Sequence, residues 1–105
     1  MCWYTSFVYC LVVIHDVELS RLALRQLRKV PRHVVDKLLA WIHLVEEEGL
    51  EEARKIPGFH DEPLLGRRVG QRSVRLSRAY RAIYKIEQRR VISFVVVEKV
   101  TKHDY

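Results

Sequence analysis

The sequence has few of the residues that mark disulfide-rich, collagen-like or linker-like chains. Its 105 residues include two cysteines, four glycines and three prolines. Two cysteines are too few for a disulfide scaffold, so we expect Cys2 and Cys10 to be apolar thiols in a reducing cytoplasm. The low glycine and proline content excludes a collagen-like chain and a flexible linker.

The sequence also lacks a hydrophobic run long enough for a membrane span. Residues 7–14 are strongly apolar, but Asp16 ends this run well short of the roughly 20 residues that a span needs. Residues 1–15 contain no lysine or arginine, so the basic region of a signal peptide is missing. We therefore expect residues 7–15 to form a buried strand in a cytoplasmic protein with no membrane partner.

What remains is the composition of one small globular domain. Apolar residues make up 49% of the chain and charged residues 30%, which excludes wholesale disorder. A chain of this length has room for one core, so residues 1–105 are expected to form a single domain, with residues 1–7 as a possible extension.

The first half of the chain has the apolar spacing of helices. Asp16 is expected to cap a helix whose apolar residues recur up to Val30, and a second apolar stripe runs over residues 34–45. Acidic residues and Gly49 end this stripe, and residues 50–56 allow one more short turn of helix. Residues 17–48 thus predict a helical hairpin with one apolar face, in which Trp41 is a core residue.

The second half has the alternation of strands. Strands are expected over residues 71–77, 79–86 and 91–100, after a loop at 57–70 and with a turn at 87–90. Residues 91–100 are apolar on both faces, which is typical of a central strand. The order β-α-α-β-β-β predicts an α+β fold in which the helical hairpin packs on a mostly antiparallel four-stranded sheet.

The positive charge is concentrated in this second half. The net charge is +6, yet residues 17–55 are nearly neutral, with eight Lys/Arg against seven Asp/Glu. Residues 62–90 carry nine Lys/Arg against two glutamates, a surplus of seven, and eight of the nine are arginines. Such a block predicts attraction to nucleic acid, although a solvated basic face or a dock for an acidic partner would have the same composition.

Within this block, Arg81 has the most informative position. It shares a strand face with Ile83, so its charge is expected to be partly desolvated and to need an anionic partner. Arg72 and Arg78 stand at strand ends and are expected to be exposed. Tyr80 and Tyr84 are expected to pack in the core rather than to stack on bases.

Two short segments could supply acid–base chemistry. Residues 60–62 (HDE) and 103–105 (HDY) together offer a carboxylate, an imidazole and a tyrosine near the arginines. A carboxylate base, a cation and an imidazole acid would suffice for phosphodiester cleavage by an RNA 2′-hydroxyl, with no metal or cofactor. The same residues could be loop caps or exposed acids, and their spacing is not diagnostic of a metal site.

Four motifs, taken in order, resemble a known family. They are residues 62–66 (EPLLG), 70–76 (GQRSVRL), 80–86 (YRAIYKI) and 100–105 (VTKHDY). Their order and spacing are similar to those of the RelE/ParE superfamily of bacterial toxins, in particular the RelE, HigB and YoeB types. The likeness covers roughly residues 8–105.

The resemblance implies the toxin of a type II toxin–antitoxin system, a ribosome-dependent endoribonuclease (mRNA interferase) that an antitoxin neutralises. Glu62 would then be the general base and His103 the general acid, with Arg81 and Arg75 at the scissile phosphate. Tyr105 would stack on or orient the substrate, although Asp104 separates it from His103 where the YoeB pattern has adjacent histidine and tyrosine. The remaining residues expected to bind RNA are Arg67, Arg68, Arg72, Arg78, Lys85 and Lys102.

Two alternatives stay open. A ParE-like poison of DNA gyrase would share the fold without needing an acid or a base, and His103 and Tyr105 favour the nuclease over it. A member of the fold that binds RNA or protein without cleaving is the second alternative.

Overall fold

The computed structural model describes residues 14–66, 69–90 and 92–102. The expected strand at 7–15 therefore lies almost wholly outside the described residues, as do Cys2 and Cys10. Ile14, His15 and Asp16, which are described, adopt no regular structure. Arg67, Arg68, His103, Asp104 and Tyr105 are also outside the described part of the chain.

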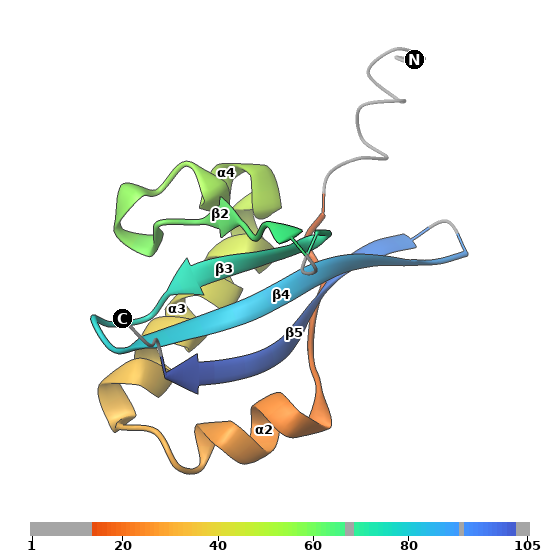
Figure 1. The fold of residues 1–105 in the computed structure, drawn as a ribbon. Coiled ribbons are helices and arrows are strands. Elements are labelled where there is room, and N and C mark those ends of the chain that lie inside the picture. Colours follow the sequence, from red (N-terminus) through yellow and green to blue (C-terminus); the bar gives the residue numbers. More distant parts are fainter. Residues whose placement is uncertain (1–13, 67–68, 91, 103–105) are drawn as a thin grey trace.

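Among the described residues, five strands form one sheet in the order β1-β5-β4-β3-β2 (Figure 1), and two of them, β1 and β2, were not predicted from the sequence. The long central pair is β4 (Tyr80–Arg89) and β5 (Ile92–Lys102), which run antiparallel. β3 (Gln71–Arg75) pairs antiparallel with β4, and the two-residue β2 (Glu62–Pro63) pairs antiparallel with β3. β1 (Val17–Leu19) pairs with β5 in parallel. The α+β class, the mostly antiparallel sheet and the central position of β5 are confirmed.

The first helix begins later than predicted. Residues 17–19 are drawn into the sheet, where the amide N–H of Val95 donates to the carbonyl oxygen of Asp16 at 2.8 Å. Asp16 therefore does not cap the helix. Ser20 does so, because its Oγ accepts from the N–H of Ala23 at 3.0 Å, and α2 spans Arg21–Leu27.

The second helix and its short continuation match the prediction. α3 spans Arg32–Glu48 and α4 spans Leu50–Arg54, with Gly49 between them at φ 93°, a backbone angle that favours glycine. Trp41 is fully buried on α3, and its ring lies 5.0 Å from that of Tyr84 on β4. This pair joins the helical layer to the sheet.

The turn between the last two strands lies further along the chain than predicted. β4 continues through residues 87–89, and Arg90 then adopts a left-handed φ of 59° at the end of the strand. A register shift opposite Ile83 and Tyr84 changes the alternation in β5, so that both Val97 and Val100 reach the core.

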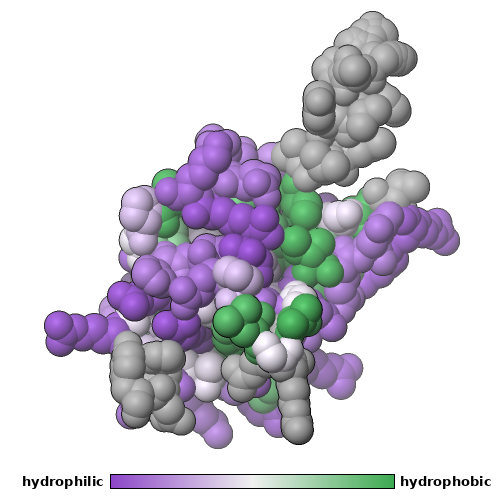
Figure 2. Space-filling model, turned by 45° about the horizontal axis from the view of Figure 1, so that its top comes forward, coloured by the Kyte–Doolittle hydropathy of each residue, from purple (hydrophilic) through white to green (hydrophobic). Residues whose placement is uncertain are grey.

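The two faces of the sheet differ. α3 covers one face, which contributes Val74, Ala82 and Tyr84 to the core, and α2 runs along β5 (Figure 1). The opposite face, here called the outer face, carries Ser73, Arg75, Arg81 and Ile83. Hydrophilic residues dominate the side that bears β2 and α4, and exposed hydrophobic residues form separate small areas there (Figure 2). No helix among the described residues is long and apolar enough to cross a membrane.

Candidate functional site

The predicted residues Glu62 and Arg81 meet on the outer face of the sheet. Strand β2 places Glu62 directly opposite Ser73 of β3, and Arg81 lies on the neighbouring strand β4. The Arg81 Nη1 donates to Glu62 Oε1 at 3.1 Å and to Ser73 Oγ at 2.9 Å. The Arg81 side chain is only 16% exposed, so the expectation that its charge needs an anionic partner is confirmed.

His60 lies beside this ion pair. Its backbone adopts a left-handed conformation with φ 49° and ψ 52°, at the end of the short 3-10 turn Pro57–Phe59. Its Nε2 lies 3.6 Å from Glu62 Oε2, the carboxylate oxygen that does not bind Arg81. Both side chains are about half exposed, so Glu62 faces a cation on one side and a titratable ring on the other.

A second arginine lies next to Arg81. Arg75 of β3 stands directly opposite Arg81 of β4, and Thr101 of β5 stands on the other side of Arg81. Arg75 makes no ion pair with any described residue. Two like charges opposite one another in a sheet repel, and an anion bound between them would relieve that repulsion.

On the opposite side of the sheet, Asp61 forms a buried network. Its carboxylate is fully buried and accepts from Arg72 Nε at 2.7 Å and from the Tyr84 hydroxyl at 2.6 Å. Burial and the hydrogen bond to Asp61 raise the pKa of Tyr84. Burial disfavours the charge of Arg72, but the hydrogen bond and the charge of Asp61 outweigh it and raise the pKa of Arg72.

This network corrects one expectation. Arg72 was expected to be exposed, but its side chain is only 26% exposed because it turns toward the core face to neutralise Asp61. From the sequence, Asp61 was expected to be a loop cap. Since Asp61 directly precedes Glu62, the network holds the strand that carries the candidate base.

The other predicted RNA-binding residues are spread over the sheet. Lys85 is bound by Glu87 at 2.8 Å and Glu98 at 3.2 Å, and these two carboxylates raise its pKa. Arg78 and Lys102 are exposed. Arg67, Arg68, His103 and Tyr105 lie outside the described residues. Lys102, the last described residue, stands opposite Tyr80, at the same end of the sheet as Arg81.

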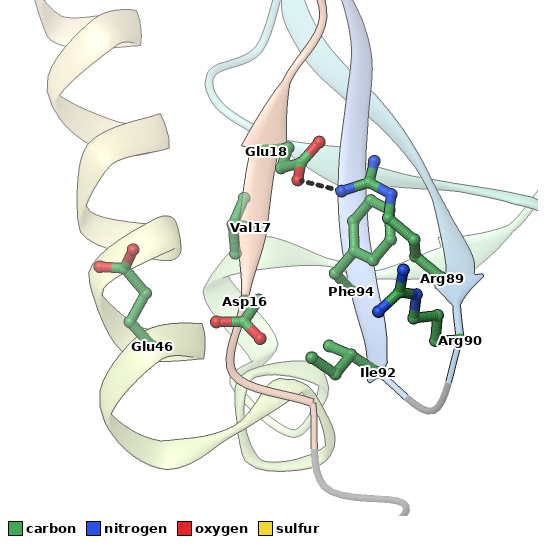
Figure 3. Close-up of a pocket in the computed structure, with 8 residues that line it drawn as sticks. All are labelled: Asp16, Val17, Glu18, Glu46, Arg89, Arg90, Ile92 and Phe94. Atoms are coloured by element: carbon green, nitrogen blue, oxygen red, sulfur yellow. Dashed lines mark ion pairs between the residues drawn. The ribbon is translucent and has the colours of Figure 1, made fainter.

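One cavity lies elsewhere, at the far end of β4 and β5. It has a volume of about 740 Å³ and is bordered by β1, the start of β5 and Glu46 of α3 (Figure 3). One of its two arginines, Arg89, is already engaged, since it lies 3.5 Å from Glu18 and over the ring of Phe94. Neither of the described candidate acid–base residues, His60 and Glu62, borders it, so this cavity is separate from the candidate site.

Comparison with solved structures identifies the fold. The YoeB/ParE toxin from Agrobacterium tumefaciens superposes with a TM-score of 0.60 and 17% identity, over 85% of this chain and 99% of that one. YafQ from E. coli gives 0.60 and 20%, over 85% and 93%, and RelE of the archaeal RelE–RelB complex from Pyrococcus horikoshii gives 0.59 and 20%, over 84% and 93%. The chain has the fold of the RelE/ParE toxins.

These structural matches, at 17–20% identity, identify the fold. No protein-family model matches the sequence, and a search among curated proteins finds no match. YafQ and the archaeal RelE were crystallised with the antitoxins DinJ and RelB, respectively. The RelE/ParE-like resemblance of the four motifs is thus confirmed at the level of the fold.

The sequence missed one member of the site. Ser73 lies on the strand face that the alternation assigned to it, yet it is fully buried under the side chain of Arg81. A serine between arginine and valine in a strand carries no signal of such a role. Only the pairing of β2, β3 and β4 brings Ser73 between Glu62 and Arg81.

Proposed function

We propose that this protein is the toxin of a type II toxin–antitoxin system and acts as a ribosome-dependent endoribonuclease on mRNA in the cytoplasm. The observation that carries the proposal is the Glu62–Arg81–Ser73 cluster, with Arg75 beside it, on an uncovered face of a RelE/ParE fold. A half-exposed carboxylate beside two guanidinium groups provides the base and the cations that RNA cleavage needs. Complexes of structural neighbours with antitoxins support the partner.

The proposed chemistry is an internal transfer of the phosphoryl group. Glu62 removes the proton of a ribose 2′-hydroxyl, and the 2′-oxygen attacks the adjacent phosphorus. The bond from phosphorus to the 5′-oxygen breaks, which leaves a 2′,3′-cyclic phosphate and, once the leaving oxygen is protonated, a 5′-hydroxyl. We assign that last proton to His103, with Tyr105 orienting the substrate.

The two arginines would stabilise the transition state. Arg81 and Arg75 can both reach an anion above their strands, and arginine binds phosphate oxygens in pairs. When the phosphate binds Arg81, Glu62 loses part of its ion pair and becomes available as a base. Ser73 then keeps one hydrogen bond to Arg81, which holds the guanidinium in place.

RNA outside the scissile position would lie along the remaining basic residues. We assign this contact to Arg78 and Lys102, which are exposed, and to Arg67 and Arg68. Arg72 and Lys85 would contribute less, because their charges are already neutralised by Asp61 and by Glu87 with Glu98.

Mapping of new 5′ ends of mRNA after brief induction tests the proposal. Glu62→Gln should reduce cleavage inside translated codons by about 100-fold or more, as expected for loss of a general base. Glu87→Gln is the matched control, because Glu87 has the same exposure (42% against 43%) and likewise pairs with one cation of the sheet. Arg81→Ala and His103→Ala should also abolish the new ends.

Two results would contradict the proposal. Equal cleavage by Glu62→Gln and Glu87→Gln would remove Glu62 from the site. Growth arrest by the wild-type protein without any new mRNA ends, accompanied by a DNA-damage response, would favour the gyrase poison instead.

A further inference from the structure

Helix α2 has a basic surface that the charge count of the sequence concealed. Residues 20–35 contain five Lys/Arg and no acidic residue, whereas five of the seven acids of residues 17–55 lie within 46–52. The near neutrality of residues 17–55 is thus the sum of two oppositely charged regions. The basic residues are Arg21, Arg25, Arg28, Lys29 and Arg32.

The cations of α2 are exposed and unpaired. Arg21, Arg25, Arg28 and Lys29 are all exposed, and none of them forms an ion pair within the described part of the chain. Only Arg32, which begins α3, has an acidic neighbour, at 3.9 Å from Asp36. Charges left unpaired on a folded surface are available to an outside partner.

Three of these arginines surround a shallow hollow. Ala23 and Leu27 turn α2 toward the core, so the opposite side of the helix presents Arg21, Arg25 and Arg28. They border a hollow of about 310 Å³ whose fourth wall is Leu24, a leucine that is 48% exposed. Guanidinium groups beside an apolar side chain can bind phosphates and stack on bases at the same place.

The hollow is connected to the candidate site through β5. Ser20 Oγ donates to the carbonyl oxygen of Glu98, and Gln26 Oε1 accepts from the N–H of Val100 at 2.7 Å, so α2 lies along residues 98–100 (Figure 1). This stretch of β5 carries Lys99, and Lys102 follows it. Neither lysine forms an ion pair with a described residue.

A basic path therefore runs across the molecule. It leads from the arginines of α2 over Lys99, which stands opposite Ile83 on the outer face, to Arg81 and Arg75 on the same face. An acidic protein could bind α2 alone, but cations that extend from α2 over Lys99 to Arg81 and Arg75 on the outer face fit a long polyanion. RNA is the polyanion that the proposed function supplies.

We propose that α2 is a second RNA-binding surface, which holds a part of the RNA that lies away from the scissile phosphate. This inference rests on the proposed nuclease function. The α2 surface gives affinity without sequence preference, because its contacts go to phosphates and base faces. Glu62 and Arg81 remain responsible for cleavage.

The test compares two triple variants in the inactive Glu62→Gln protein, which leaves the RNA intact. One carries Arg21→Gln, Arg25→Gln and Arg28→Gln. The control carries Lys55→Gln, Arg89→Gln and Arg90→Asn, which removes the same charge from exposed positions away from the path; asparagine suits the left-handed backbone of residue 90. The probe is an oligouridylate of about 20 nucleotides, longer than one small domain covers, titrated by fluorescence anisotropy at several salt concentrations.

We expect the α2 variant to bind the probe more weakly by about tenfold or more. The slope of log K against log[salt] should become shallower by about 2, because each phosphate contact to a single strand contributes about 0.7 and three contacts are lost. The control should keep the wild-type slope. Equal losses in the two variants, or no loss in the α2 variant, would overturn the inference. The inference would also be overturned if the protein bound an oligoglutamate peptide more tightly than RNA and the α2 variant no longer bound that peptide. In that case α2 would be a binding site for an acidic protein.

The outcomes separate this inference from the proposed function. If the wild type cleaves mRNA but the α2 variant binds RNA as well as its parent does, the inference about α2 is wrong and the proposed nuclease function still holds. Loss of RNA binding in the α2 variant, with no cleavage by the wild type even on ribosomes, would support the α2 surface and contradict the nuclease.

Discussion

At the scale of single residues, two neighbouring acids have opposite surroundings. Glu62 lies half exposed on the outer face, whereas the carboxylate of Asp61, the residue just before β2, is fully buried on the other side of the sheet. Successive residues of a strand point to opposite faces, so a buried anchor at 61 places the side chain at 62 on the outer face. The anchor thereby positions the candidate base without touching the substrate.

Replacement of Asp61 should therefore affect both stability and activity. Asp61→Ala leaves Arg72 and the Tyr84 hydroxyl without their shared acceptor, and we expect the free energy of unfolding to fall by about 2–3 kcal/mol. Asp61→Asn keeps an acceptor oxygen and should lose less. Urea unfolding measures the stability, and cleavage under folded conditions should show kcat reduced more by Asp61→Ala than by Asp61→Asn. Equal kcat in both variants and the wild type would contradict a positioning role.

The tyrosine of this network predicts a pH dependence. Its pKa is raised in the folded protein, so between pH 10 and the raised pKa the unfolded chain has lost a proton that the folded chain retains. Stability must therefore fall as the pH rises above about 10, by up to about 1.4 kcal/mol per pH unit from this group. The Tyr84→Phe variant keeps all the other titrating groups. The difference in the free energy of unfolding between the wild type and this variant therefore reports on Tyr84 alone. The two stability curves should converge at high pH, and parallel curves would contradict the assignment.

At the scale of elements, short segments are held by single side chains. α2 has only seven residues, too few for a helix to be stable by itself. Ser20 caps it and also donates to the carbonyl oxygen of Glu98, so that one hydroxyl both starts the helix and fixes it to β5. The parallel strand β1, which ends one residue earlier, depends on the same attachment.

Substitution of Ser20 should loosen this corner of the molecule. Ser20→Ala loses both hydrogen bonds, and we expect a loss of about 1–2 kcal/mol in the free energy of unfolding. Ser20→Thr keeps a hydroxyl in the same place and serves as the control. Hydrogen exchange should show faster exchange of the N–H of Ala23 in Ser20→Ala than in Ser20→Thr. Unchanged exchange would mean that the cap contributes nothing.

At the scale of the whole molecule, a helical layer covers one face of the sheet and leaves the other face to function. Trp41 and Tyr84 join the two layers, and the hydroxyl of Tyr84 extends from this core to Asp61. The cations of α2 continue over Lys99 of β5 to Arg81 of β4 on the outer face. A small protein with this layout exposes its chemistry on a surface, which suits a large substrate.

The sequence by itself determined the α+β class, the order of the main elements, the burial of Trp41 and the need of Arg81 for an anion. These follow from periodicity and local chemistry, which a linear sequence contains. Only the tertiary structure decided that residues 17–19 join β5, that residues 62–63 form an edge strand, and that Arg72 turns inward to Asp61. Each of these depends on a partner far away in the chain. Propensity and alternation carry no information on such partners, because pairing between distant strands is settled by packing of the whole core.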